Sequence, residues 1–173
     1  MRIVSPLPLL GFFAALIAAG GIHAQSGPGP SFETADRILV EKSERKLYLL
    51  KAGKVLREFD IALGLAPTGH KQRSGDFKTP EGNYFIESRN TASDYFLSLK
   101  ISYPNEQDRE RARTLDVDPG GQIMIHGQPN NPRYDDNWYE YGDWTDGCIA
   151  VSNSDMIDIW LMTEVPTPIE IRP

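Results

Sequence analysis

Cysteine is almost absent from this sequence of 173 residues: Cys148 is the only one, so no disulfide can form within the chain. A lone thiol does not stabilise a fold as a disulfide does, because only a cross-link constrains the unfolded chain. In an oxidising compartment it is also exposed to oxidation and mispairing. Two interpretations of Cys148 stay open on this count, a reactive nucleophile or a small buried side chain of the kind free cysteine often forms.

Long hydrophobic runs are equally scarce. The one clear run, residues 3–19, follows Arg2, is broken twice by proline, and leads into small residues that end at Ala24. This order is typical of a secretory signal peptide. The run is too short and too broken for a transmembrane helix of about 20 residues, and no second run follows, so we expect no stable membrane insertion. Cleavage after Ala24 would leave two histidines, His70 and His126, as candidate general bases.

Basic residues are too few and too scattered for a nucleic-acid-binding protein. Without residues 1–24 the chain has 17 Lys and Arg against 24 Asp and Glu, and no basic patch is visible. Residues 25–30 (QSGPGP) lack the apolar side chains that offset ordering entropy, so we predict a flexible lead-in over 25–34. Residues 35–173 have the size of one domain. We therefore expect a monomeric periplasmic or secreted protein of one domain after a cleaved signal.

Alternating apolar and polar residues predict that this domain is mainly β. A polar turn separates two such stretches, 37–42 and 46–50, which favours a hairpin. Further extended runs are predicted at 55–63, 83–87, 95–102, 122–125 and 167–171. Two helices interrupt the strands. The first, 105–115, is charged nearly all round, whereas the second, 152–163, begins at N-capping side chains and carries an apolar face.

Candidate catalytic residues lie between positions 123 and 153. The apolar run 123–125 ends at His126 and Gly127, and Gly147 directly precedes Cys148 at the start of another apolar run. If the two runs are neighbouring strands, the imidazole can accept the thiol proton or stabilise the thiolate. Gly147 would let backbone amides point at the oxygen of a tetrahedral intermediate. This pattern favours acyl transfer, although His126 could equally be a structural histidine at a strand end.

These residues resemble the signature of the L,D-transpeptidase catalytic-domain family, whose members remodel bacterial peptidoglycan. The resemblance rests on Ile125-His126-Gly127, on Gly147-Cys148-Ile149 and on Asn153. A second stretch supports it, the glycine-rich segment 64–71 followed by 75–82, which contains the Thr-Pro-x-Gly element typical of the family. The resemblance covers roughly residues 37–172, which is nearly all of the chain after the predicted signal.

The resemblance implies a β-sandwich of mixed sheets with one or two short helices. It also implies that Cys148 attacks the diaminopimelate carbonyl of a peptidoglycan tetrapeptide stem, releases D-alanine and passes the acyl group to an amine, as in a 3-3 cross-link. His126 would be the base, oriented by the carbonyl of Gly127, and amides near Gly147 and Cys148 would form the oxyanion hole. Stem peptides are the implied partners, and no metal or organic cofactor is implied.

Asp146 departs from the family pattern, in which many members have a histidine two positions before the cysteine. A carboxylate so close to the nucleophile tends to raise the thiol pKa by like-charge repulsion. Its presence is compatible with catalysis if Asp146 faces either His126 or a cationic substrate group. We favour the second, because a diaminopimelate stem presents an ammonium near the reacting carbonyl.

Ala150 is a second departure, because arginine is frequent at this position in the family. Any contact with a substrate carboxylate would then come from another cation. Arg133, Lys71 and Arg73 are candidates, although each is more simply explained as a solvated surface charge. For His70 we expect a local hydrogen bond within its loop.

The insert between the two catalytic motifs, residues 128–144, contains Trp138, Tyr139, Tyr141 and Trp144 among many Asn and Asp residues. Such rings can form a lid that excludes water and stacks on a sugar or peptide, or they can anchor the loop to the core. Both roles stay open, and Trp144 is the ring that we expect to contact substrate.

Two further functions stay open beside transpeptidation. A hydrolase would use the same scaffold and the same residues, with water taking the acyl group. A catalytically weak wall-binding module would account for Asp146 and Ala150, whereas the presence of both Cys148 and His126 argues against it.

Overall fold

Three antiparallel strands open the domain, as the alternating pattern predicts. The computed structural model describes residues 33–140 and 142–173, so the predicted signal peptide and most of the lead-in lie outside the described residues. Strand β1 (Arg37–Glu41) pairs with β2 (Lys46–Lys51), and β2 pairs with β3 (Lys54–Asp60). Every second residue points into the core, and the buried pairs Ile38 with Leu49 and Val40 with Leu47 lie directly opposite each other.

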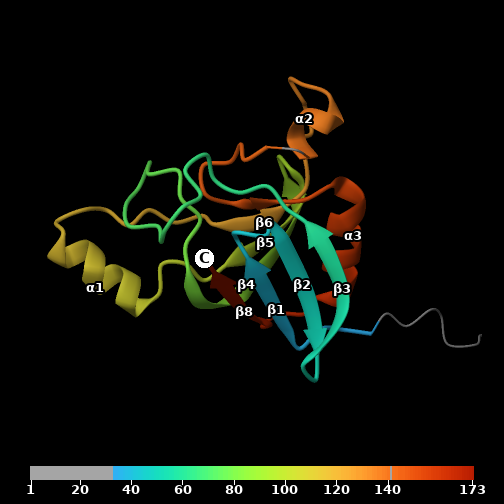
Figure 1. The fold of residues 1–173 in the computed structure, drawn as a ribbon, viewed down its shortest axis with the longest axis horizontal. Coiled ribbons are helices and arrows are strands. Elements are labelled where there is room, and N and C mark those ends of the chain that lie inside the picture. The colour runs from blue at the N-terminus through green and yellow to red at the C-terminus, as the bar shows by residue number, and fades with distance from the viewer. Residues whose placement is uncertain (1–32, 141) are drawn as a thin grey trace, which may run out of the picture. The chain divides into compact units, whose positions relative to one another are not determined.

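The eight strands of the described residues are hydrogen-bonded in the order β3-β2-β1-β8-β4-β5-β6-β7, and Figure 1 labels all of them except β7. Strand β8 (Pro168–Arg172) runs parallel to β1 and antiparallel to β4 (Gly82–Ser93). Because β4 is 12 residues long, it pairs with β8 at its start and with β5 (Phe96–Ile101) along the rest. The predicted mainly-β fold of mixed strands is confirmed, and β4 joins the two halves of the predicted sandwich.

The strands that position the site lie at the far end of this order. Strand β6 (Met124–His126) pairs antiparallel with β5 and parallel with β7 (Ile149–Ala150). Both halves of the sheet contribute to one hydrophobic core, whose fully buried members include Ile38, Leu47, Leu49, Ile86, Leu99, Ile101, Ile125 and Ile149. The site is thus built on strands whose other residues are held by the core.

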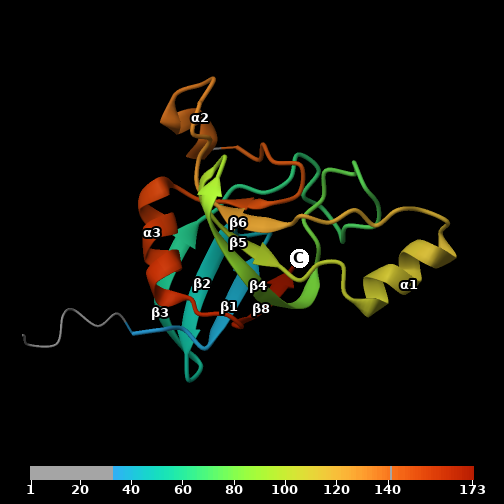
Figure 2. The same ribbon diagram turned by 180° about the vertical axis from the view of Figure 1, so that it is seen from behind.

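Two of the three helices agree with the prediction. Helix α1 (Glu106–Thr114) begins with a capping box between Asn105 and Asp108 and extends away from the sheet (Figure 2). Helix α3 (Asn153–Met162) is capped by Ser152 and buries Met156 and Ile159 in the core. None of the described helices is long and apolar enough to cross a bilayer.

The structure adds a third helix, α2 (Asp136–Glu140), within the insert. Its five residues span little more than one turn, and the surrounding Asn, Asp and Pro residues are typical of loops. A helix this short has no apolar periodicity that a sequence could reveal.

Candidate active site

The parallel pairing of β6 with β7 places His126 and Cys148 on neighbouring segments. His126 is the last residue of β6 and lies opposite Ala150, and Cys148 directly precedes β7. Both side chains line a pocket with a volume of about 490 Å³. The structure therefore brings the predicted base and the predicted nucleophile together in one cavity.

His126 is held in a single tautomer by its own backbone neighbour. Its Nδ1 lies 2.7 Å from the carbonyl oxygen of Gly127. A carbonyl can only accept, so Nδ1 carries the proton and the neutral ring keeps Nε2 as an acceptor. Burial lowers the pKa of His126 to about 4, although the bond to Gly127 opposes this shift. At neutral pH the imidazole is uncharged and can take a proton.

The aromatic rings of Tyr95 and Trp144 enclose this imidazole. Their ring centroids lie 4.6 Å and 5.6 Å from that of His126, and both residues line the same pocket. The backbone after the histidine is also fixed, because Asn153 Oδ1 accepts from Gln128 N at 2.8 Å. A side chain at Gly127 would place its Cβ 2.5 Å from that same oxygen, so the position requires glycine. The ring is therefore rigidly oriented.

The thiol of Cys148 is half-buried and protonated in the resting site. Its Sγ donates to the carbonyl oxygen of Gln122 at 3.5 Å. Burial raises the thiol pKa and the carboxylate of Asp146 adds to this shift, while a backbone hydrogen bond from Met124 and the charge of Lys71 oppose it. The site thus pairs a neutral thiol with a neutral imidazole, an arrangement suited to proton transfer during attack.

The turn before the nucleophile is organised by Thr145. Its buried hydroxyl accepts from Gly147 N at 3.1 Å and donates to the carbonyl oxygen of Cys148 at 2.8 Å. Gly147 has a φ of +129°, and a Cβ there would lie 2.6 Å from the carbonyl oxygen of Lys78. Glycine at this position is therefore required by both the backbone conformation and the close approach of residue 78.

The expected oxyanion hole needs a correction at Gly147, because its amide is already bonded to Thr145. The amides of Asp146 and Cys148 donate no hydrogen bond to any residue within 33–140 and 142–173. These two N–H groups, rather than that of Gly147, are available to an oxyanion.

Asp146 lies on the exposed rim of the pocket, and Trp144 lines the pocket beside it. In the described part of the chain, the Asp146 carboxylate forms neither an ion pair nor a hydrogen bond. Burial and Gly127 alone account for the shifted pKa of His126, so Asp146 is not the partner of the imidazole. Of the two roles considered for Asp146, the one in which it faces a ligand agrees with this geometry.

The predicted cations lie in different surroundings. Lys71 is buried, not solvated as expected, and its Nζ donates to Asp76 Oδ1 at 2.7 Å and to the carbonyl oxygen of Arg73 at 3.1 Å. Despite burial, bonds from Lys71 and three backbone amides lower the pKa of Asp76 to about 2. The side chains of Arg73 and Arg133 are exposed, and neither lines the pocket.

His70 has the local role expected of it. Its Nδ1 accepts from Glu81 N at 3.0 Å, and its Nε2 lies 3.1 Å from Asp108 Oδ1 on α1. This histidine therefore joins its loop to α1 and belongs to the scaffold. Among the residues that the structure describes, no three His, Cys, Asp or Glu side chains lie close enough to hold a metal ion.

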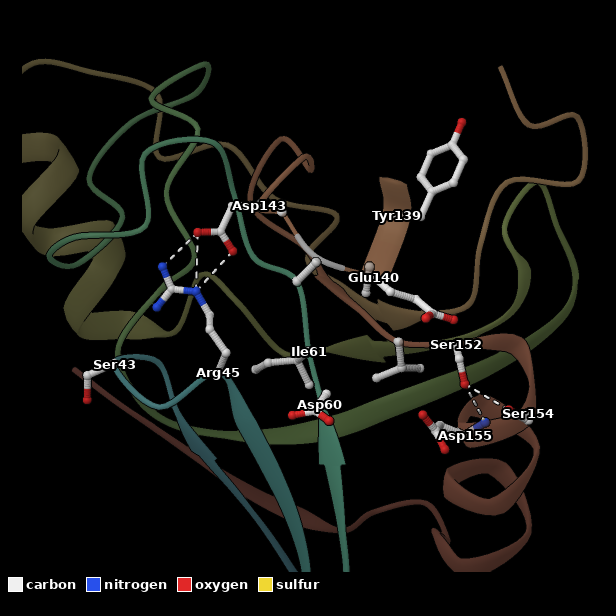
Figure 3. Close-up of a pocket in the computed structure, with 14 residues that line it drawn as sticks. Ser43, Arg45, Asp60, Ile61, Tyr139, Glu140, Asp143, Ser152, Ser154 and Asp155 are labelled. Atoms are coloured by element: carbon white, nitrogen blue, oxygen red, sulfur yellow. Dashed lines mark hydrogen bonds and ion pairs between the residues drawn. The ribbon is translucent and has the colours of Figure 1, made fainter. Parts of the chain in front are cut away.

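A larger groove, of about 740 Å³, lies beside the site, and Asp143 and Ala150 are among its lining residues (Figure 3). It contains neither the thiol nor an imidazole. Arg45 Nη2 lies 2.7 Å from Asp143 Oδ2, and Asp143 Oδ1 also accepts from Leu63 N at 2.8 Å. These contacts fix the end of the insert directly before Trp144.

Tyr95 and Thr145 are the residues of this site that sequence reasoning missed. Thr145 stands two residues before Gly147, a spacing at which a hydroxyl commonly accepts from a turn amide, so its role had a signal. Tyr95 lies 31 positions before His126 in the chain. Only the pairing of β5 with β6 brings the start of β5 to the histidine, so no local pattern identifies Tyr95.

Residues 35–171 match the family model of the L,D-transpeptidase catalytic domain (YkuD). A protein of Escherichia coli strain K12 named "Putative L,D-transpeptidase YafK" is 35% identical over 96 residues, which are 52% of this chain and 37% of that protein.

Solved structures show the same fold. The helical cell shape determining protein Pgp2 from Campylobacter jejuni superposes with a TM-score of 0.59 and 26% identity, covering 81% of this chain and 48% of that one. The L,D-transpeptidase from Xylanimonas cellulosilytica superposes with a TM-score of 0.51 and 17% identity, covering 84% and 64%. The chain thus spans less than half the length of YafK and of Pgp2.

Proposed function

The chain belongs to the L,D-transpeptidase catalytic-domain family, and we propose that it is a cysteine-dependent transpeptidase acting on the tetrapeptide stems of peptidoglycan. One observation carries the proposal. Cys148 and His126 share a pocket, and the Gly127 carbonyl leaves Nε2 of the ring free to accept the thiol proton. In the other neutral tautomer Nε2 would carry the proton, and only Nδ1, which faces the Gly127 carbonyl, could accept one.

The chemistry proceeds in two acyl transfers. As Sγ attacks the diaminopimelate carbonyl, the thiol proton passes to Nε2 of His126. The C–N bond to D-alanine then breaks, the imidazolium protonates the leaving amine, and a thioester remains on Cys148. In the second transfer an acceptor amine attacks the thioester and gives up a proton to His126. The C–S bond breaks, the new amide is released, and the proton returns to sulfur.

The oxyanion of each tetrahedral intermediate would be stabilised by backbone amides. The N–H groups of Asp146 and Cys148 support this role, because they belong to the nucleophile and to the residue two positions before it and have no partner in the described residues. Removing one such donor from an enzyme typically lowers kcat by about a hundredfold or more.

Asp146 would bind the ammonium of the diaminopimelate side chain. Its carboxylate is exposed on the rim of the pocket, close enough to Cys148 to raise the thiol pKa. A cation bound there would cancel this unfavourable field, so substrate binding itself would favour thiolate formation. The Asp146 carboxylate would therefore disfavour the Cys148 thiolate in the empty site, but it would favour catalysis once it has bound the substrate ammonium.

The place of action would be the periplasm or the cell exterior, reached through the N-terminal signal of residues 1–24. That segment has the order of a charged residue, an apolar run and small residues typical of a cleaved signal. Peptidoglycan lies in this compartment. The likeness to a protein that determines helical cell shape accords with a role in the wall.

The test is to incubate the chain without residues 1–24, and its Cys148→Ala variant, with purified tetrapeptide muropeptides and to analyse the products by mass. Cross-linked dimers that have lost D-alanine, formed only by the unmodified protein, are the expected result. Tripeptide monomers alone would show a hydrolase that uses the same nucleophile. Unchanged muropeptides, or equal products from both proteins, would contradict the proposal.

A further inference from the structure

Tyr141 lies outside the described residues, and the other aromatic side chains of the insert divide into two groups. We call residues 128–144 the arm. Tyr139 is buried and Trp144 is half-buried, and the Trp144 Nε1 donates to the carbonyl oxygen of Tyr139 at 3.1 Å. By contrast, Tyr134 and Trp138 are 54% and 46% exposed. Of the two roles considered for these rings, the anchor applies to the first group and leaves the second without a function in the fold.

The exposed pair is an ordered surface. The rings of Tyr134 and Trp138 are stacked, with centroids 4.3 Å apart and planes at 28°. Their backbone is fixed as well, because Trp138 N donates to Asp135 Oδ1 at 3.0 Å and Arg133 N donates to the Tyr139 hydroxyl at 3.0 Å. Large aromatic side chains rarely remain exposed together without a ligand or partner.

The rings of the two groups contact one another in a continuous series that ends at His126. The Tyr139 centroid lies 5.1 Å from that of Trp138 and 5.1 Å from that of Trp144, and the Trp144 ring lies 5.6 Å from His126. Figure 1 shows α2, which carries Trp138, projecting from the side of the domain where the arm leaves β6. The exposed pair is thus joined to the catalytic base by a series of ring contacts, although neither of its rings lines the catalytic pocket.

The composition of the arm indicates a neutral, polyhydroxylated ligand. The arm has no Ala, Val, Ile, Leu, Met or Phe, so its apolar surface is aromatic apart from proline. It carries one basic residue, Arg133, against four acidic ones. An anionic membrane surface would select basic and aliphatic residues instead. The apolar C–H face of a sugar ring stacks on aromatic rings, and Asn and Asp side chains can bond to its hydroxyls.

We propose that Tyr134 and Trp138 form a docking surface for the glycan strand of peptidoglycan. The proposal rests on the proposed function, since it assigns the arm to the polysaccharide that bears the stem peptides. Sugar rings would stack on the exposed faces of the two aromatic side chains while the stem enters the pocket of Cys148 and His126. The arm would then distinguish a stem attached to glycan from a free peptide.

A binding measurement tests this surface without any reaction. Neutral chitooligosaccharides share the β-1,4-linked N-acetylated sugar backbone of peptidoglycan and lack the lactyl carboxylates that removal of the stems would expose. They are titrated into the Cys148→Ala protein, and affinity is read by calorimetry. Trp138→Ala and Tyr134→Ala should each weaken binding about tenfold, the loss expected of an aromatic hot spot. Phe85→Ala is the matched control, because Phe85 is an equally exposed aromatic residue, at 53%, on β4 outside the arm.

A second measurement links the surface to turnover. Trp138→Ala should lower the ratio of kcat/KM for disaccharide-tetrapeptide to kcat/KM for free tetrapeptide, mainly through KM of the former. An equal loss on both substrates would show that Trp138 only supports the arm and would overturn the proposal. So would absent glycan binding, binding unaffected by either arm variant, or a preference for phosphatidylglycerol vesicles over glycan.

The two proposals fail in different ways. Glycan binding that depends on Trp138, without conversion of any muropeptide, would leave the docking surface intact and overturn the transpeptidase assignment. Turnover of free tetrapeptide without glycan binding would leave the transpeptidase assignment intact and overturn the docking surface. Melting temperatures of the three variants, compared with that of the parent protein, establish that each is folded.

Discussion

The loop of residues 64–82 and the catalytic pocket contact each other at Gly147. They differ in whether their polar groups have partners within the protein. Two strongly buried cations at the loop have partners: Lys42, which directly follows β1, donates to three oxygens of the loop, and Lys71 donates to Asp76, which also accepts from three backbone amides. In the pocket, the amide of Cys148 and the carboxylate of Asp146 have no partner in the described part of the chain.

This difference indicates that the loop supports the site and that the pocket provides the groups that act on a substrate. A polar group that is already bonded within the protein is not available to a ligand, whereas an unpaired group beside a pocket is. The satisfied loop presents the Lys78 carbonyl to Gly147 and thereby fixes the turn that carries the nucleophile. The unsatisfied groups of the pocket are the ones available to a substrate. Mutations that act on one region alone should therefore change either stability or turnover.

The largest effect is expected at the base. His126→Gln removes the proton acceptor while keeping a side chain of similar size, so kcat/KM should fall by about a thousandfold. The residual activity should rise with pH, because only the thiolate that forms unaided can then attack. Steady-state rates on tetrapeptide muropeptides across pH measure both effects, and a loss below tenfold would contradict the role of His126.

The pH profile of the unmodified protein also tests the role of His126 as the base. His126 must be uncharged to accept a proton, and its pKa is lowered to about 4 by burial. Activity should therefore rise as pH increases through about 4 and be undiminished at pH 6, where an ordinary histidine is mostly charged. A half-maximal rate near pH 6.5 would show that the imidazole is not buried as described.

Variants of the loop should act mainly on stability, because the charge of Lys71 is only a minor influence on the thiol pKa of Cys148. Lys71→Met leaves Asp76 without its cationic partner in a buried site, which typically costs about 3 to 5 kcal/mol. Lys46→Met is the matched control, because Lys46 pairs with Glu58 and Asp60 at the surface, where such pairs contribute about 0 to 1 kcal/mol. Urea unfolding measures both, and equal losses would contradict the contrast between the two pairs.

The turn at Thr145 joins the two regions, and its variants should affect turnover more than stability. Thr145→Val keeps the shape but removes the bonds to Gly147 N and to the Cys148 carbonyl. We expect kcat to fall about ten- to a hundredfold with KM little changed, because a misdirected nucleophile harms the reaction more than binding. Thr145→Ser should restore most of the rate. If Val and Ser behave alike in burst kinetics, the hydroxyl does not position the turn.

The sequence predicts those parts of the site that depend on residues near one another in the chain. It does not predict the parts that depend on contacts between residues distant in the chain. His126, Gly127 and Cys148 stand beside glycines and apolar runs, so their local pattern predicts both their strands and their roles. Lys71 could not be separated from a surface lysine, because its burial depends on Asp76 and on Gly120, which is distant in the sequence and lies close to the Lys71 side chain. The bond from Gly147 to Thr145 is local, yet only the turn geometry shows that it occupies the amide.

The smallest effect, and the most informative about substrate, is expected at Asp146. Asp146→Asn removes a charge that raises the thiol pKa, so the pKa of Cys148 should fall, measurably by the rate of alkylation with iodoacetamide across pH. Without a substrate role this change alone would speed the reaction slightly. If Asp146 binds the diaminopimelate ammonium, KM should instead rise several-fold while the free thiol becomes more reactive. Glu110→Gln, on exposed α1, should alter neither quantity. A more reactive thiol with unchanged KM would show that Asp146 faces no cation, and the ammonium contact would have to be abandoned.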